Sequence, residues 1–196
     1  MADMDKAGVR KAILSMASTP GVWFDLPLPK VIEMVRSVNE YGAEMVRDFK
    51  FHADIAWARS FARMMRSTPW VDPALEAADW IVPMPLSRQR LLERGFNQSD
   101  VLAAALETGQ PRKVRRDVLV RTRDTAAQSS LPRSERHANV ANAYVVHPEG
   151  FNAVQGKKVV LVDDVMTTGA SLHAAARALA QAGAAQTIAL VFARTP

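Results

Sequence analysis

The chain has 196 residues, 48% of them hydrophobic, with 25 Lys and Arg against 20 Asp and Glu. This length and composition suit one globular domain, or one domain with a small appendage. The sequence has no cysteine and four scattered histidines, which excludes disulfides and thiolate-bound metals and favours a cytoplasmic location. For the same reason we expect no zinc site. No apolar run approaches the ~18 residues that cross a bilayer, so we expect no membrane insertion either.

The positive charge is concentrated in one stretch of the chain. Residues 84–136 contain 11 basic and 6 acidic side chains, a net charge of +5, which equals the formal net charge of the whole chain. Clustered positive charge favours an anionic partner, either a phosphorylated small molecule or a nucleic acid.

Helical periodicity marks the first part of the chain. Apolar residues recur at spacings of three and four over residues 5–17, 31–49 and 53–65, as on one face of an amphipathic helix. We therefore expect an α-helical N-terminal segment over residues 1–40, followed by the main domain over residues 41–196.

Strands and helices alternate from about residue 70 onward. Short apolar runs predict strands at residues 80–82, 118–120, 144–146, 159–162 and 188–192. Helical patterns cover residues 99–106 and 171–182, and Gly183 is placed to end the second of them. This alternation predicts an α/β domain with a mainly parallel sheet.

Residues 159–172, VVLVDDVMTTGASL, combine a strand, two carboxylates and a turn of small residues. Asp163 and Asp164 follow the apolar strand at the carboxyl edge of the sheet, where open α/β sheets bind ligands. The turn over residues 167–171 then offers backbone N–H groups and hydroxyls to a tetrahedral anion at a helix N-terminus. Carboxylates beside a phosphate site suit sugar hydroxyls or hydrated Mg²⁺. The segment therefore predicts a phosphosugar site, rather than two solvated aspartates at an ordinary strand end.

This segment resembles the phosphoribosyl-pyrophosphate (PRPP) signature of type I phosphoribosyltransferases. Two further blocks resemble the ComF family of competence-associated phosphoribosyltransferase-like proteins: IVPMPLSRQRLLERGFNQ at residues 81–98 and RTRDTAAQSSLPRSERHANVANAY at residues 121–144. A weaker match covers residues 41–51. The resemblance implies a type I phosphoribosyltransferase fold, a mainly parallel sheet flanked by helices, preceded here by the α-helical N-terminal segment. Many ComF proteins begin with a four-cysteine zinc ribbon, which a cysteine-free sequence lacks.

The resemblance also implies a role for each part of the 159–172 segment. Asp163 and Asp164, as catalytic residues, would hold the ribose hydroxyls and orient Mg²⁺ through PRPP or water, with no direct protein ligand to the metal assigned. The implied ligands of the 5′-phosphate are Thr167, Thr168, Gly169, Ala170 and Ser171.

The two arginine-containing blocks would flank the pyrophosphate. The planar guanidinium fork suits phosphate oxygens, and the implied pyrophosphate ligands are Ser87, Arg88, Arg90 and Arg94. A lid that excludes water from the reacting centre is implied to contain Arg121, Arg123, Gln128, Arg133, Arg136 and Asn139. The intervening GFNQ at residues 95–98 is read either as a turn with a helix N-cap or as a direct ligand contact.

The implied reaction is displacement of pyrophosphate from C1′ of PRPP by a nitrogen nucleophile, catalysed mainly by positioning and electrostatics. The acceptor stays unknown, because phosphoribosyltransferases select it with a variable hood, and residues 1–40 are the candidate hood or docking piece. The alternative is a non-catalytic, PRPP-responsive competence or DNA-uptake factor that binds single-stranded DNA. Between residues 84 and 136 the sole aromatic residue is Phe96, which gives weak support to base stacking and favours the small-molecule role.

One basic cluster stays outside both blocks. It consists of Arg112, Lys113, Arg115 and Arg116. If the protein contacts nucleic acid, this cluster is the expected place. The sequence leaves open whether the chain is a monomer or a homo-oligomer.

Overall fold

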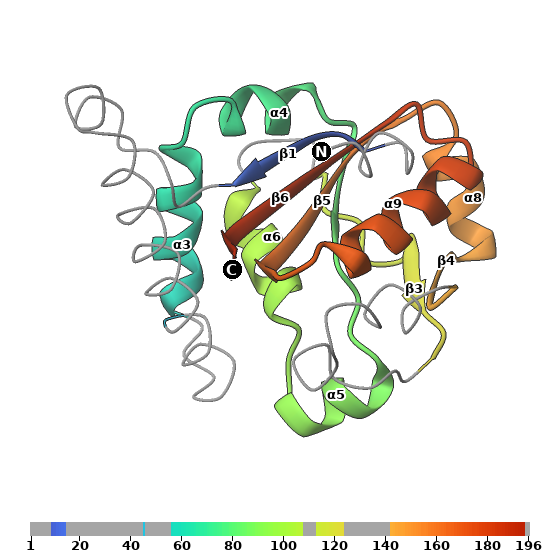
Figure 1. Ribbon diagram of the computed structural model, residues 1–196, viewed down its shortest axis with the longest axis horizontal. Coiled ribbons are helices and arrows are strands. Elements are labelled where there is room, and N and C mark those ends of the chain that lie inside the picture. The colour runs from blue at the N-terminus through green and yellow to red at the C-terminus, as the bar shows by residue number, and fades with distance from the viewer. Residues whose placement is uncertain (1–8, 15–44, 46–55, 108–112, 124–141, 195–196) are drawn as a thin grey trace.

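The fold is centred on a parallel β-sheet (Figure 1). The computed structural model describes residues 9–14, 45, 56–107, 113–123 and 142–194. Within these ranges, four parallel strands pair in the order β1-β6-β5-β2. They are β1 (Val9–Leu14), β2 (Trp80–Pro83), β5 (Lys158–Met166) and β6 (Gln186–Arg194). A separate antiparallel pair joins β3 (Leu119–Arg121) to β4 (Tyr144–Val146).

Helices cover both faces of the sheet. One face packs against α9 (Ala170–Gln181), the β3–β4 pair and α8 (Phe151–Val154). The other face packs against α3 (Ala56–Arg66), α4 (Val71–Ala77) and α6 (Gln98–Leu106). Figure 1 shows α9 and α6 on opposite sides of the strands. The remaining elements are α5 (Arg88–Arg94), which precedes α6, and the short helix η2 (Pro148–Gly150), which precedes α8. The predicted α/β class is confirmed.

Strand β5 is buried on both faces. Val159 and Leu161 pack into the apolar cluster on the α9 side, and Val160 and Val162 pack into the cluster on the α6 side. Successive side chains of a strand point to opposite faces, so a strand covered on both sides needs a continuous apolar run. The five strands predicted in the second part of the chain are each present, and β5 and β6 are longer than expected.

Residues 9–14 form a strand where the sequence predicted a helix. β1 runs parallel to β6, with Ala12 opposite Ala189 and Leu14 opposite Val191. This pairing satisfies the hydrogen-bonding edge of β6, which outweighs a weak helical preference in so short a segment. The helical prediction for residues 1–40 is therefore wrong at residues 9–14, and the rest of that range lies outside the described residues.

The other helical predictions are met in part. The helix predicted over residues 53–65 corresponds to α3, and of residues 31–49 the structure describes Met45, which is helical. The two seven-residue helices α4 and α5 were not predicted, because so few residues hardly display a helical period. In the described ranges, no helix is long and apolar enough to span a membrane.

Candidate functional site

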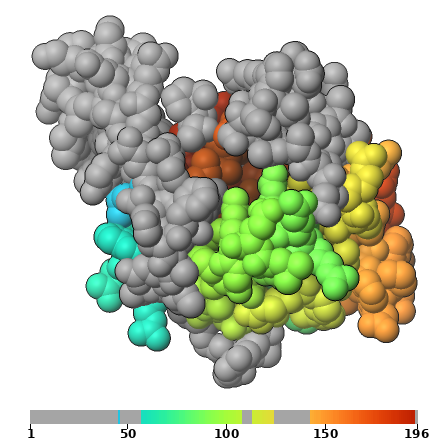
Figure 2. Space-filling view, turned by 90° about the horizontal axis from the view of Figure 1, so that it is seen from below, coloured from blue at the N-terminus to red at the C-terminus, as the bar shows by residue number. Residues whose placement is uncertain are grey.

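A cavity of about 570 Å³ lies at the carboxyl end of the parallel sheet. Its walls come from the start of α6 and the segment before it, from the β3–β4 pair, and from the turn between β5 and α9. Figure 2 looks at this side of the molecule, with the green surface of α5 standing forward of the orange β5–α9 region. The volume falls within the ~300–1,000 Å³ of small-molecule sites, and this end of the sheet is where α/β proteins bind ligands.

Both aspartates of the predicted site lie within β5, rather than beyond its end. β2 accompanies β5 only as far as Pro83 opposite Val162, whereas β6 accompanies it to the end of the strand. The flank of β5 that β2 leaves uncovered therefore opens onto the cavity. Asp163 and Asp164 line the cavity there. On the other edge of β5, pairing with β6 holds this part of the strand in place.

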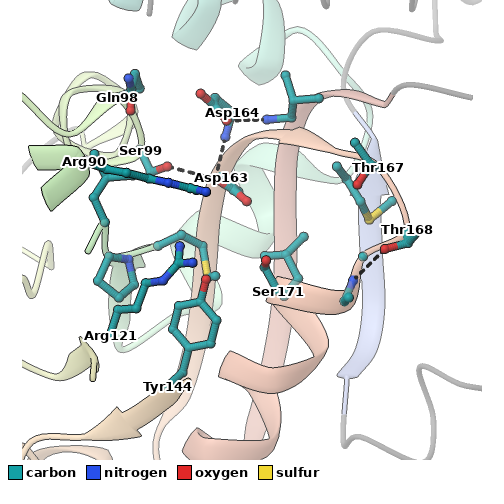
Figure 3. A pocket seen from close by; sticks show the side chains of 18 of the residues that line it. Arg90, Gln98, Ser99, Arg121, Tyr144, Asp163, Asp164, Thr167, Thr168 and Ser171 are labelled. Carbon is teal, nitrogen blue, oxygen red and sulfur yellow. Dashed lines mark hydrogen bonds between the residues drawn. The ribbon is translucent and has the colours of Figure 1, made fainter. Parts of the chain in front are cut away.

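Hydrogen bonds fix the orientation of these two carboxylates. Asp163 Oδ1 accepts from Ser99 Oγ at 2.9 Å and from the backbone N–H of Asp164 at 3.0 Å. Asp164 is buried, and its Oδ1 accepts from the backbone N–H of Val165 at 2.7 Å. Figure 3 shows both groups at the centre of the site. A carboxylate has about four lone-pair sites, so one group can accept from the protein and from a ligand at the same time.

The donor set suits Mg²⁺ bound together with its ligand. Mg²⁺ in proteins commonly takes one or two carboxylates and completes its shell with substrate phosphates and water. Asp163 and Asp164 supply such a pair, and no group of three potential metal ligands from His, Cys, Asp and Glu occurs in the described ranges. Mg²⁺ would therefore depend on phosphate oxygens of the substrate for most of its coordination.

The turn predicted to bind the 5′-phosphate encloses the N-terminus of α9. All five of its residues, from Thr167 to Ser171, line the cavity. Gly169 is the N-cap with φ of 77°, and a Cβ there would meet Met166 Sδ at 3.3 Å. This left-handed backbone favours glycine and brings the first N–H groups of the helix to the cavity. A helix N-terminus presented in this way suits a phosphate.

Three arginines line another wall of the same cavity. They are Arg90, Arg94 and Arg121, and Figure 3 shows Arg90 and Arg121 across the cavity from Thr167 and Thr168. Burial lowers the pKa of Arg90, and the charges of Arg121 and Arg94 lower it further. Within the described part of the chain, no carboxylate forms an ion pair with Arg90 or Arg94. Three guanidinium groups at one cavity wall, with Glu93 beside them, leave a net positive charge that suits a multivalent anion.

The predicted pyrophosphate ligands fall into two groups. Arg90 and Arg94 line the cavity, whereas Arg88 is exposed outside it. Ser87 is buried as the N-cap of α5, and its Oγ accepts from the backbone N–H of Arg90 at 3.4 Å. Residues four apart share one face of a helix and residues two apart do not, so α5 turns Arg90 and Arg94 to the cavity and Arg88 away.

The predicted lid is described only at its beginning. Arg121 lines the cavity, and Arg123 is exposed and lies outside the lining. The other predicted lid residues lie outside the described ranges, and their roles stay predictions: Gln128, Arg133, Arg136 and Asn139.

The GFNQ segment forms the turn and helix N-cap that were one of its two interpretations. Gly95, with φ of 77°, ends α5, and Asn97 caps α6 by accepting from the backbone N–H of Ser99 at 3.1 Å. Asn97 Nδ2 also donates to the carbonyl of Met84 at 3.0 Å. Gln98, by contrast, lines the cavity with 1% of its surface exposed. The turn and N-cap are thus formed, and ligand contact through Gln98, which lines the cavity, stays a prediction.

Replacing Gln98 with methionine is expected to raise the midpoint of thermal unfolding. Gln98 Nε2 is buried without a hydrogen-bond partner in the described part of the chain, and such a group costs about 1–3 kcal/mol. Methionine has a similar length and no amide to desolvate. Thermal unfolding of Gln98→Met, compared with Gln181→Met at an exposed position of α9, measures the effect. An equal or lower midpoint for Gln98→Met would show that the amide already has a stabilising partner.

Ser99 and Tyr144 are among the site residues that the sequence analysis missed. Ser99 holds Asp163 from 64 positions away, and Tyr144 lines the cavity opposite Arg121 in the β3–β4 register. Ser99 follows the GFNQ segment and Tyr144 begins a predicted strand. The local sequence therefore indicated the secondary structure around each residue, but not the distant residue beside it in the fold.

The remaining basic cluster is engaged in intramolecular contacts. Lys113 Nζ donates to two carbonyl groups of α4, at 3.1 and 2.8 Å. Arg115 forms an ion pair with Asp117 at 2.7 Å and lies over an indole ring, and Arg116 pairs with an aspartate of α6. Arg112 lies outside the described residues. These contacts attach the segment between α6 and β3 to the sheet and reduce the charge available to a nucleic acid.

Comparison with known proteins identifies the family of the chain. Residues 91–196 match the family model described as a phosphoribosyl transferase domain. The chain is 39% identical over 111 residues to the DNA utilization protein YhgH of Escherichia coli K12, covering 57% of this chain and 47% of that protein. It is 33% identical over 171 residues to YhgH of Salmonella typhimurium, covering 82% of this chain and 71% of that protein.

A further relative is the competence protein ComFC of Bacillus subtilis, 32% identical over 155 residues, with 79% of this chain and 60% of that protein covered. The chain thus spans about half the length of its Escherichia coli relatives. With the domain match over half of the chain and these relatives, the chain belongs to the ComF family of phosphoribosyltransferase-domain proteins.

Proposed function

We propose that the protein binds Mg²⁺·PRPP and transfers its phosphoribosyl group to a nitrogen acceptor, with release of pyrophosphate. One observation carries the proposal: a single cavity holds the adjacent carboxylates of Asp163 and Asp164, a helix N-terminal turn and three arginines. PRPP carries a 5′-phosphate, two ribose hydroxyls and a pyrophosphate. The three kinds of group in the cavity complement these three parts of the molecule.

Each group has a distinct task in this reaction. The turn at residues 167–171 would hold the 5′-phosphate, while Asp163 and Asp164 accept hydrogen bonds from the 2′- and 3′-hydroxyls. The acceptor nitrogen forms a bond to C1′ as the bond from C1′ to the pyrophosphate oxygen breaks. Arg90 and Arg94 would stabilise the charge that develops on that oxygen. Bound Mg²⁺ would supply further charge neutralisation on the pyrophosphate.

A pyrophosphate-release assay tests the catalytic part of the proposal. The protein is incubated with Mg²⁺·PRPP and one member of a panel of nucleobases and primary amines. Release that depends on both the protein and the acceptor would support transfer and identify the acceptor class. Binding of PRPP without acceptor-dependent release across the panel would point to the non-catalytic alternative.

That alternative is a PRPP-responsive factor in DNA uptake, and the names of the relatives favour it. The Bacillus subtilis relative is a competence protein and the Escherichia coli relative a DNA utilization protein. We infer that this chain serves competence or DNA utilization as well, whether through catalysis or through DNA binding. Titration with single-stranded DNA at several salt concentrations, with and without PRPP, tests for DNA binding. An affinity for DNA that falls as salt rises would indicate contacts to DNA phosphates.

A further inference from the structure

Gln98 is a buried polar side chain of the cavity that the reaction described above does not use. It is the first residue of α6, it has 1% of its surface exposed, and it lines the cavity. No atom of the described ranges accepts a hydrogen bond from its Nε2. An amide NH₂ group can only donate, so the group that satisfies it must be an acceptor. Because a buried donor without a partner costs free energy, a ligand that supplies the acceptor would recover this cost.

The neighbouring residue of α6 places Gln98 beside the aspartates. Ser99 Oγ donates to Asp163 Oδ1 at 2.9 Å, so the first turn of α6 is attached to β5 at the carboxylates. Figure 3 shows Gln98 at the opposite end of the site from Arg121 and Tyr144. The amide therefore belongs to the carboxylate part of the cavity, to which the proposed function assigns the ribose hydroxyls.

The chemistry of a sugar hydroxyl calls for a donor beside the carboxylates. A hydroxyl has one proton to donate and two lone pairs with which to accept. Ionised carboxylates only accept, so Asp163 and Asp164 can receive the protons of the ribose hydroxyls but cannot use their lone pairs. An amide N–H next to the carboxylates supplies the missing donor. A carboxylate and an amide together therefore match a hydroxyl, and they do not match a carbon that carries only hydrogen.

We propose that Gln98 is a specificity-determining residue: its Nε2 donates to a ribose hydroxyl that itself donates to a carboxylate, so that the cavity selects ribose phosphates over deoxyribose phosphates. This inference rests on the proposed function, which assigns the ribose to Asp163 and Asp164. A site with buried polar groups for a substrate hydroxyl rejects the analogue that lacks it, because those groups are then left unpaired.

Gln98→Met tests the role of the amide with ribose 5-phosphate, 2-deoxyribose 5-phosphate and 3-deoxyribose 5-phosphate. Methionine keeps the length of the side chain and removes the donor. It should weaken ribose 5-phosphate about 5-fold, as expected for one neutral hydrogen bond. One deoxy sugar should lose the same factor, whereas the other, which lacks the hydroxyl that Gln98 contacts, should bind equally to parent and variant. Isothermal titration calorimetry measures the affinities and shows whether that hydroxyl is on C2 or C3.

Two controls separate this role from a structural one. Gln181→Met makes the same chemical change at an exposed position of α9 and should leave all three sugar affinities unchanged. Mg²⁺·pyrophosphate has no sugar hydroxyl, so Gln98→Met should leave its affinity unchanged as well. A structural role of Gln98 would instead weaken all three sugars by the same factor. Such an equal loss, or a loss confined to pyrophosphate, overturns the proposal.

These outcomes are distinct from failure of the proposed function. A parent protein that binds neither ribose 5-phosphate nor Mg²⁺·pyrophosphate overturns the proposed function, and the role of Gln98 with it. A parent that binds both ligands, while Gln98→Met binds ribose 5-phosphate as tightly as the parent does, overturns only the role of Gln98. Thermal unfolding of each variant confirms that the proteins compared are folded.

Discussion

Replacing Asp163 and Asp164 together by asparagine is expected to weaken binding of Mg²⁺·PRPP by about 100-fold or more, since each hydrogen bond to a charged group contributes about 1.5–3 kcal/mol. The double variant should fold, because asparagine Oδ1 can still accept from Ser99, from the backbone N–H of residue 164 and from that of Val165. Isothermal titration calorimetry against the parent measures the loss.

The matched control removes two carboxylates elsewhere. Asp79 and Asp117 lie outside the cavity lining and form ion pairs with Lys157 and Arg115. The variant with asparagine at both positions has the same change in net charge, and its PRPP affinity should match that of the parent. Equal losses in the two double variants would assign the effect to overall charge, and an unchanged affinity with asparagine at residues 163 and 164 would refute the site.

Replacing Arg90 with methionine is expected to weaken PRPP and pyrophosphate binding by about 10- to 100-fold while raising the thermal unfolding midpoint. A lowered pKa in a cation means that the folded state disfavours its charge. Arg90 bears this cost through burial and through repulsion by Arg121 and Arg94. Methionine removes the cost and also removes a charge-assisted contact to phosphate, worth about 1.5–3 kcal/mol. The two measurements therefore move in opposite directions.

Arg88→Met on the same helix is the control for this variant. Arg88 is exposed and lies outside the cavity lining, so its replacement should leave both the affinity and the unfolding midpoint near those of the parent. An equal loss of affinity in Arg88→Met would mean that the charge of α5 acts nonspecifically. A fall in the unfolding midpoint of Arg90→Met would show that the arginine is stabilised by partners rather than repelled.

The sequence predicts where Asp163, Asp164 and the turn at residues 167–171 lie, because these groups are contiguous in the chain. A strand, two aspartates, a small-residue turn and a helix follow one another between Lys158 and Gln181. Their order alone brings the carboxylates and the helix N-terminus to one end of the sheet. The glycine at position 169 carries the backbone conformation that the turn requires.

The sequence predicted that arginines would line the site, but not which of them face the cavity. The sequence placed Arg88, Arg90 and Arg94 together in one block as pyrophosphate ligands. Residues 88–94 form α5, and the rotation of that helix selects which arginines face the cavity. The basic cluster that includes Lys113 and Arg115 contributed to the same charge count, yet it contacts carbonyl and carboxylate groups of the protein itself.

Local sequence patterns could not predict contacts between segments that are far apart in the chain. Ser99 and Asp163 are 64 positions apart, and β1 joins the sheet across more than 170 residues, with Ala12 opposite Ala189. A six-residue strand with apolar residues at both three- and four-residue spacing carries no period that separates it from a helix. Its partner β6 decides its conformation.

Calorimetric titration of the parent protein with Mg²⁺·PRPP, alongside ribose 5-phosphate and Mg²⁺·pyrophosphate, tests the central claim most directly. If one cavity binds both ends of PRPP, the intact molecule should bind at one per chain and more tightly than either half, and each half should compete with it. Absence of saturable PRPP binding, or binding of PRPP that neither half displaces, would contradict the assignment of this cavity.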